Sequence, residues 1–165
     1  MIGRVLSCCL VALAASASRP AIAQEFPQRP VTLVIPFGPG GSVDVLGRAF
    51  AQVIEASLKE RVVVVNRPGG GETIGMNAVA QSAPDGLTWI YTPVTPVTIQ
   101  PHRMKLPYPR DALAPVCQTF ENVFYIAVGS NSPYKTFADL LGYARANPGK
   151  GRYFTAGVGS SPHLA

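Results

Sequence analysis

Three short stretches that combine glycine with hydroxyl residues have the clearest potential for chemistry in this sequence. The first glycine turn, residues 36–44, reads PFGPGGSVD; the second, residues 66–73, reads NRPGGGET; the third, residues 157–161, reads GVGSS. Glycine lets the backbone come close to a ligand, and the first turn of a helix has N–H groups without intrahelical partners. Since the helix dipole typically adds about 0.3 to 1 kcal/mol at exposed sites, these turns predict a site for an anion.

None of the three turns has the pattern of a dedicated phosphate site. In the first glycine turn no lysine precedes Ser42, so the turn is not a Walker loop, and Pro39 removes a possible N–H donor. Gly38, Gly40 and Gly41 do not have GxGxxG spacing. Taken singly, each turn is also compatible with a plain connection between two elements.

The turns follow apolar runs that are typical of buried parallel strands. Val31–Ile35 and Val62–Val65 predict two strands, and the apolar residues between them recur at helical spacing. The predicted helical face consists of Val45, Leu46, Ala49, Phe50, Val53 and Ile54. Strand, helix and strand in this order predict a βαβ unit with a right-handed crossover, and ligands of open α/β sheets gather at the carboxyl ends of the strands.

The rest of the chain continues to alternate between strand and helix patterns. A short helix is predicted over residues 74–81, and a longer one over residues 137–146 after Thr136, a good N-cap residue. Further strands are predicted over residues 87–92, 124–128 and 152–156. Proline recurs too often between residues 93 and 115 for regular structure, so this stretch is expected to be a long surface excursion.

The first 23 residues have the composition of a secretory signal. Arg4 precedes an apolar stretch, and Ala21 and Ala23 have small-x-small spacing. The apolar stretch is shorter than the about 20 residues that a bilayer span needs. Cleavage is therefore expected after Ala23, which predicts an exported, periplasmic protein. A lipoprotein site before Cys8 is the weaker alternative, because almost no chain precedes it.

Charge and cysteine content narrow the function classes. The chain has 14 Lys and Arg against 9 Asp and Glu; loss of Arg4 and Arg19 with the signal leaves 12 against 9, a charge of +3. This mild basic charge suits a small anion, whereas the scattered basic residues do not form the aromatic-interleaved cluster that nucleic acid requires. Cys117 then remains alone, so no internal disulfide is expected, and it is interpreted as a small buried apolar residue.

Four motifs together carry a family resemblance. RPVTLVIPFGPGGSVDVLGR, VVVVNRPGGGETIG, SAPDGLTWI and ARANPGKGRYFTAGVGSSPHLA occur in this order. With them the chain, from about Phe26 to Ala165, resembles the periplasmic solute-binding proteins of tripartite tricarboxylate transporters, the Bug or TctC-like family. The resemblance implies an α/β periplasmic binding protein of type II, the two-lobed Venus flytrap fold, which traps a small carboxylate between its lobes and has no catalytic activity.

The resemblance also implies domain boundaries and ligand residues. Residues 24–118 would form the N-terminal part of the first lobe and residues 119–165 the truncated start of the second, with the crossing near residues 115–121. In the family, ligand carboxylates are met largely by backbone N–H groups and hydroxyls of the glycine turns. The matching positions here are Gly40, Gly41, Ser42, Asp44, Asn66, Gly69, Gly71, Thr73, Gly159, Ser160, Ser161 and His163.

Several positions depart from the family pattern. Glu72 stands where glycine is common, Thr73 where asparagine is common, and Val43 replaces a frequent threonine. Because a carboxylate in the site would repel an anion, Glu72 is expected to point to solvent near the helix start, where it favours the dipole. Asp44 is expected to accept backbone N–H bonds in the first helical turn rather than to bind the amino group of an amino-acid ligand. His163 could donate to a carboxylate.

Length is the largest departure, because family members run on for roughly as many residues again. The chain is therefore interpreted as an N-terminal fragment. Residues 24–165 alone are expected to be unstable or aggregated and to bind carboxylates weakly, since uncovered apolar positions erode a net stability of about 5 to 15 kcal/mol.

These observations predict a monomeric solute-binding protein that passes a carboxylate to the membrane components of a tripartite tricarboxylate-type transporter, without a cofactor, a metal or nucleic acid. Citrate and other di- and tricarboxylates, aromatic carboxylates and amino acids are all open as ligands. A truncated product that does not bind and an exported enzyme are the alternatives. The enzyme is less favoured because Ser160, Ser161 and His163 lack a GxSxG elbow and an acid placed to orient the histidine.

Overall fold

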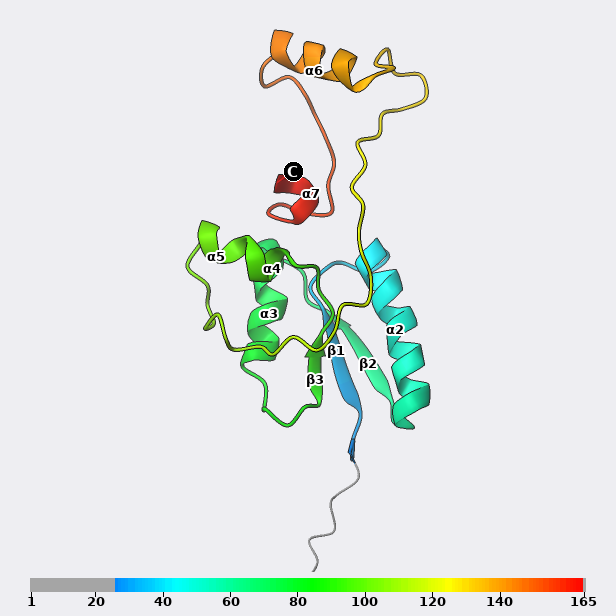
Figure 1. The fold of residues 1–165 in the computed structure, drawn as a ribbon, viewed down its shortest axis with the longest axis vertical. Helices are drawn as coiled ribbons and strands as arrows, with labels where there is room; N and C mark the ends of the chain where they lie inside the picture. Colours follow the sequence, from blue (N-terminus) through cyan, green and yellow to red (C-terminus); the bar gives the residue numbers. More distant parts are fainter. Residues whose placement is uncertain (1–25, 165) are drawn as a thin grey trace, which may run out of the picture.

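A computed structural model describes residues 26–164 of the chain (Figure 1). The predicted signal and its cleavage site lie outside the described residues. Three parallel strands, β1 (Val31–Ile35), β2 (Val62–Asn66) and β3 (Thr88–Ile90), form one sheet in the order β2-β1-β3. The three strands predicted over this part of the chain are therefore confirmed, and β1 is central.

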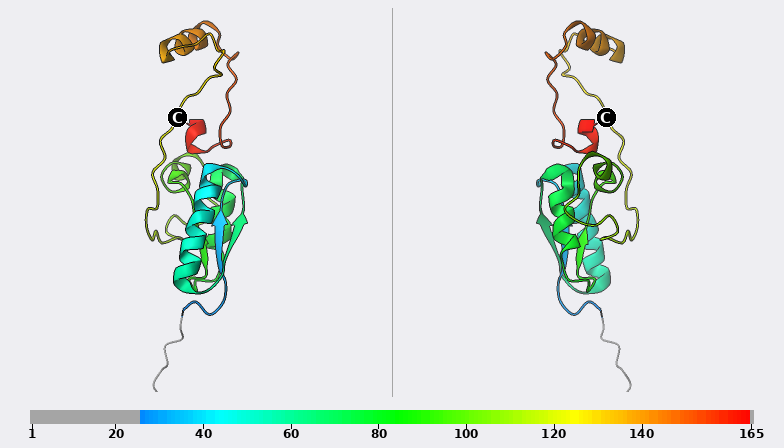
Figure 2. Two further views of the ribbon diagram at one scale, coloured as in Figure 1. Left: turned by 90° about the vertical axis from the view of Figure 1, so that its right-hand side faces the viewer. Right: turned by 90° about the vertical axis from the view of Figure 1, so that its left-hand side faces the viewer.

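Two helices cover opposite faces of this sheet (Figures 1 and 2). α2 (Ser42–Leu58) connects β1 to β2, and α3 (Thr73–Ala80) leads from β2 to β3 after a short 3-10 turn, η1 (Gly70–Glu72). The chain moves outward from β1 and then returns across it to β3, so right-handed crossovers place the two helices on different sides. The carboxyl ends of the parallel strands share one edge, and the first two glycine turns leave from that edge.

β1 supplies the centre of the hydrophobic core. Val31, Leu33 and Ile35 are each at most 1% exposed, and they pack in one cluster with Val43 and Ala51 of α2. Burial of one large apolar side chain contributes roughly 1.5 to 3 kcal/mol. Val34, on the other face of β1, is 3% exposed, so burial of both faces explains the near-continuous apolar run of this strand.

α2 turns a different face to the sheet from the one predicted. Phe50 and Ile54 pack against the core as expected, whereas Val45, Leu46, Ala49 and Val53 are exposed. The reason is a glycine: Gly47 is buried, and a Cβ there would lie 2.6 Å from the Ile35 side chain. The helix therefore approaches β1 along a small-residue strip, and the larger apolar residues lie beside this contact.

The prediction that residues 93–115 lack regular structure is wrong in part. Two one-turn helices, α4 (Thr95–Thr98) and α5 (Gln100–Arg103), occur within this stretch. Each has a proline in its first turn, Pro96 and Pro101 respectively. Proline is favourable there because its fixed φ suits a helix start and its missing N–H would have no intrahelical partner. The prolines begin these helices rather than prevent them.

The chain then runs away from the sheet to α6 (Phe137–Ala146) and back (Figure 1). The predicted start of α6 is confirmed by a capping box. The Asp139 N–H donates to Thr136 Oγ1 at 3.2 Å, and the Thr136 N–H donates to Asp139 Oδ2 at 2.9 Å. Both bonds satisfy backbone donors that have no intrahelical acceptor.

The strands predicted over residues 124–128 and 152–156 are wrong, because neither stretch is a strand in the structure. Tyr125 is 85% exposed and Phe154 is fully exposed. A strand needs a neighbour to pair its backbone groups, and neither stretch pairs with a neighbouring segment in the described part of the chain. The burial predicted for Cys117 is wrong for the same reason, since it lies exposed in this extended part.

The chain returns to the strand ends at α7 (Ser161–Leu164), which lies close to α4. The third glycine turn precedes α7, so all three turns lie at the same end of the sheet, where the strands have their carboxyl ends (Figure 1). Among the described helices, none has the length and apolar character to cross a membrane.

Candidate functional site

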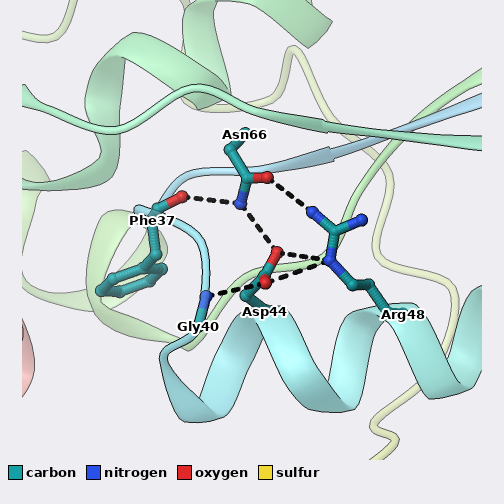
Figure 3. Close-up of polar contacts among 5 residues, drawn as sticks. All are labelled: Phe37, Gly40, Asp44, Arg48 and Asn66. Carbon is teal, nitrogen blue, oxygen red and sulfur yellow. Dashed lines mark hydrogen bonds and ion pairs between the residues drawn. The ribbon is translucent and has the colours of Figure 1, made fainter.

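The first glycine turn is held by the side chain of Asp44 (Figure 3). The Gly40 N–H donates to Asp44 Oδ2 at 2.9 Å, and Arg48 Nε donates to the two carboxylate oxygens at 3.1 and 3.0 Å. Asn66, at the end of β2, donates to Asp44 Oδ1 at 2.8 Å and to the Phe37 carbonyl at 2.9 Å. Arg48 Nη2 donates to Asn66 Oδ1 at 2.9 Å. This cluster fixes the first turn to the end of the neighbouring strand.

The same donors keep the Asp44 carboxylate ionised. Hydrogen bonds from Arg48, then from Gly40 and Asn66, lower the pKa of Asp44 from 3.8 to about 2. The expectation that Asp44 accepts a backbone N–H is confirmed, although the donor precedes the helix instead of lying in its first turn. The Asp44 and Asn66 side chains are therefore hydrogen-bonded to each other, and they hold the turn in place without lining the cavity described below.

The second glycine turn has four consecutive residues with positive φ. The angles are 115°, 61°, 59° and 77° for Gly69, Gly70, Gly71 and Glu72. Glycine adopts this region readily, whereas a glutamate there is strained. Thr73 Oγ1 donates to the Gly70 carbonyl at 2.8 Å, which closes the turn at the start of α3.

The expectation that Glu72 points to solvent is wrong. Glu72 is 3% exposed, and neither of its carboxylate oxygens has a hydrogen-bond partner among the described residues. The left-handed backbone at residue 72 carries the side chain to the inner side of the loop. Burial raises the pKa of Glu72 from 4.5 to about 8, so the group is largely neutral at pH 7 and repels an anion little.

The third glycine turn uses its polar side chains internally. Ser160 Oγ donates to the Gly157 carbonyl at 2.6 Å, and the Gly159 N–H donates to His163 Nδ1 at 3.2 Å. Ser161 Oγ is hydrogen-bonded to Thr95 Oγ1 of α4. The hydroxyls and the imidazole therefore stabilise the turn, and they do not pair as a nucleophile with its base.

Two fully buried residues that the sequence analysis missed join the turns. Gln100 Nε2 donates to the Gly71 carbonyl at 2.9 Å and to the Gly159 carbonyl at 2.8 Å, and Thr95 makes the bond to Ser161. Both lie in the proline-rich stretch that was predicted to be irregular. The available signal was a polar residue next to a helix-starting proline, at Thr95-Pro96 and at Gln100-Pro101.

A cavity of about 130 Å³ lies where the three turns meet. The first turn contributes Pro36, Phe37 and Gly38; the second contributes Pro68, Gly69, Gly71 and Glu72; residues 156–158 and Ser160 contribute the third wall. An apolar cavity of roughly 150 Å³ in another protein admits benzene, so the space is of small-molecule size. The lining contains no lysine or arginine.

The cavity brings together only some of the predicted ligand residues. Gly69, Gly71 and Ser160 line it directly. The other predicted residues support the turns around it or lie beside it: Gly40, Gly41, Ser42, Asp44, Asn66, Thr73, Gly159, Ser161 and His163. The structure thus separates a small lining set from a larger set that holds the turns in place.

A second, larger cavity of about 330 Å³ lies against α6. Leu140 and Ala144 of the helix and Arg152 and Tyr153 of the extended return segment contribute to its walls. None of the three glycine turns and no helix N-terminus contributes to its lining, which contains one cation, Arg152.

Comparisons with known proteins agree with the motifs. A sequence model of the family described as "Tripartite tricarboxylate transporter family receptor" (TctC) matches residues 46–165. This range covers the carboxyl-terminal part of α2, the second and third glycine turns and all the segments between them.

Two curated relatives come from Bordetella pertussis. A UPF0065 protein is 34% identical over 165 residues, which cover 99% of this chain and 50% of that protein. The protein BugT is 32% identical over 153 residues, which cover 91% of this chain and 47% of BugT. The chain therefore spans about half the length of the curated relatives it matches.

One solved structure, described as that of a periplasmic transporter, has a closely similar backbone. It superposes with a TM-score of 0.68 at 30% sequence identity, over 84% of this chain and 47% of the other. The similarity therefore extends over most of this chain and about half of the other.

Proposed function

Because this chain belongs to the tripartite tricarboxylate transporter receptor family, we propose that it captures a small carboxylate in the cavity between its three glycine turns. Over the part that it spans, the chain has the α/β fold of a periplasmic binding protein. We further propose that residues 24–118 and 119–165 belong to two lobes, and that the ligand lies between them. The carboxylate could carry one, two or three acid groups, an aromatic ring or an amino group.

The observation that carries this proposal is the meeting of three glycine turns around one cavity. Gly38, Gly69 and Ser160 come from three turns that are far apart in the sequence, and all three line the same space. At two of these turns a helix of eight residues or more begins, α2 or α3, whose first N–H groups lack intrahelical acceptors. These helix starts lie beside the cavity and do not line it, and the lining has no lysine or arginine. A carboxylate would therefore be held mainly by backbone N–H groups of lining residues such as Gly38, Gly69 and Gly71.

A binding role also accounts for the polar groups better than an enzymatic one. Nucleophilic catalysis requires a hydroxyl within hydrogen-bond reach of its base. Here the Ser160 hydroxyl donates to a backbone carbonyl, the Ser161 hydroxyl bonds Thr95, and His163 Nδ1 accepts from Gly159. We therefore propose a receptor without catalytic activity.

The receptor role includes a location and a partner. We propose that the protein is exported to the periplasm, that its mature form starts at Gln24, and that as a monomer it delivers its ligand to the membrane components of a tripartite tricarboxylate-type transporter. The signal-like composition of residues 1–23 and the family support this. N-terminal sequencing of the exported protein tests the cleavage, and a lipid-modified protein starting at Cys8 would contradict it.

Titration calorimetry with citrate, succinate, benzoate and aspartate tests the binding site. We expect saturable 1:1 binding of at least one of them, with the weak affinity expected of residues 24–165 alone. The informative variant is Gly38→Val, because Gly38 lines the cavity and a Cβ there would meet no atom within 4 Å. The added side chain should fill the ligand's space without disturbing the fold, and affinity should fall at least about tenfold.

Gly129→Val is the matched control. Gly129 also has nothing within 4 Å of an added Cβ, and it does not line the cavity. The control should bind as the parent does. Equal affinity of the parent and of Gly38→Val would remove the first turn from the site, and no binding of any of the four acids would count against a carboxylate receptor.

A further inference from the structure

The strongest unassigned feature is the side-chain amide of Gln100. This residue begins α5, is fully buried, and donates from one nitrogen to the Gly71 carbonyl at 2.9 Å and to the Gly159 carbonyl at 2.8 Å. The two acceptors belong to the second and the third glycine turns. One amide group thus connects two walls of the cavity that are distant in the sequence.

The backbones at this point are packed too closely for side chains. A Cβ on Gly71 would collide with the Gln100 amide, and a Cβ on Gly159 would lie 3.3 Å from the Gly71 Cα. Both glycines also have positive φ, 59° and 84°. The third turn therefore packs against the second, and the Gln100 amide is hydrogen-bonded to both.

A second contact of the same kind lies five residues earlier in the chain. Thr95 of α4 is fully buried, and its hydroxyl is bonded to the hydroxyl of Ser161 at the start of α7. Thr98, on the same helix, is exposed and donates only to the Val94 carbonyl within its own helix. One face of α4 and α5 therefore makes the contact with the third turn, and the other face does not.

We propose that Gln100 and Thr95 form a latch that holds the third glycine turn against the second before any ligand arrives. Gln100 is a positioning residue: it touches the backbone of two cavity walls and fixes their separation. The latch does not require a ligand. Its consequence for carboxylate affinity rests on the proposed function, since a wall that is already in place does not have to be ordered on binding.

Disulfide trapping tests the latch without any ligand. Thr95→Cys and Ser161→Cys are combined in a chain whose Cys8, Cys9 and Cys117 are replaced by serine, and the rate of crosslinking under mild oxidation is followed by mass spectrometry. We expect rapid intramolecular crosslinking. The control pair, Thr98→Cys with Ser161→Cys, has one partner on the exposed face of α4 and should crosslink at least about tenfold more slowly.

Adding Gln100→Ala to the first cysteine pair isolates the role of the amide. The Gly71 and Gly159 carbonyls then lose this donor, and the crosslinking rate should fall roughly tenfold. Gln100→Glu, which keeps the size but removes the donating nitrogen, should have the same effect. Hydrogen exchange at β1 confirms that the sheet stays folded in each variant. Equal rates for the two cysteine pairs, or a rate that neither Gln100 variant changes, would overturn the latch.

The affinity consequence is measured with the same four acids, citrate, succinate, benzoate and aspartate. Gln100→Ala should weaken binding of whichever acid the parent binds by about tenfold, while leaving protection of β1 unchanged. An unchanged affinity beside slowed crosslinking would restrict the latch to structure and overturn its part in binding. Rapid crosslinking of a protein that binds none of the acids would keep the latch and refute the carboxylate receptor.

Discussion

Two parts of the molecule have similar apolar sequences but different structures. β1 (VTLVI) is buried on both faces: Val31, Leu33 and Ile35 on one face are at most 1% exposed, and Val34 on the other is 3% exposed. Residues 124–128 (FYIAV) have an equally strong strand pattern, yet Tyr125 is 85% exposed and Ile126 is 72% exposed. An apolar, β-branched run is compatible with a strand, but the strand forms only where a neighbouring strand pairs with it.

The same contrast separates the rest of the two regions. Residues 31–103 contain the sheet, both covering helices and the latch residues, whereas residues 113–158 contain one regular element, α6, within the described part of the chain. The glycine turns of the first region are fixed by partly buried hydrogen bonds. The third turn depends on contacts with α4 and α5 for its position, since the segment leading to it is exposed.

The largest expected effect is the loss of folding stability when a core residue is truncated, compared with truncation of an exposed apolar residue. Leu33→Ala removes a side chain that is 1% exposed, so it should lower the free energy of unfolding by about 2 to 5 kcal/mol. Phe154→Ala removes a fully exposed ring and should change it by less than about 0.5 kcal/mol. Urea denaturation followed by circular dichroism measures both, and comparable losses would erase the distinction between the regions.

The next effect concerns the buried acid of the second turn. The pKa of Glu72 is raised from 4.5 to about 8, so the folded chain holds this proton more tightly than the unfolded chain. Its contribution to stability is complete below pH 4.5, declines between pH 4.5 and 8, and is lost above pH 8. Glu72→Gln does not titrate, so at pH 9 it should be more stable than the parent by on the order of a few kcal/mol.

Unfolding measured across pH 4 to 9 checks this prediction. The parent should lose stability over that range and Glu72→Gln should lose much less. Asp44 provides an internal control, because its lowered pKa of about 2 gives stability that is lost only as pH falls from 3.8 to 2. Identical pH profiles for the parent and Glu72→Gln would contradict the burial of this acid.

The smallest effect is expected at the cap of α6. Thr136→Ala removes the acceptor of the Asp139 N–H bond and should weaken this helix by about 1 kcal/mol. Because α6 has no buried residue, unfolding of the sheet should be unaffected. Hydrogen exchange resolved by segment would show faster exchange in residues 137–146 alone, whereas faster exchange in β1 would mean that the two regions are coupled.

Local patterns predicted those elements that depend on local chemistry. The limits of β1, the capping of α6 by Thr136 and the positions of the glycine turns follow from backbone propensity and from side chains within a few residues. The resemblance to the family added the overall fold, which the short described sheet alone would not have indicated.

The errors arose wherever a tertiary contact decided the outcome. The buried face of α2 is centred on Gly47, because the helix approaches Ile35 closely there, and a hydrophobic pattern does not indicate a contact made by a glycine. Glu72 is buried at the end of a run of four residues with positive φ, a backbone that a helix-start pattern does not predict. Gln100 joins residues 29 and 59 positions away, so its local signal, a polar residue before a helix-starting proline, does not identify these partners.

Backbone amide resonances, recorded during titration with the acid that binds most tightly among citrate, succinate, benzoate and aspartate, test the central claim most directly. If the carboxylate lies between the three turns, the amides of Gly38, Gly69–Glu72 and Gly157–Ser160 should shift together, with one dissociation constant. Shifts confined to the cavity against α6, at Leu140, Ala144 and Tyr153, would contradict the claim and place the ligand in the other region of the molecule.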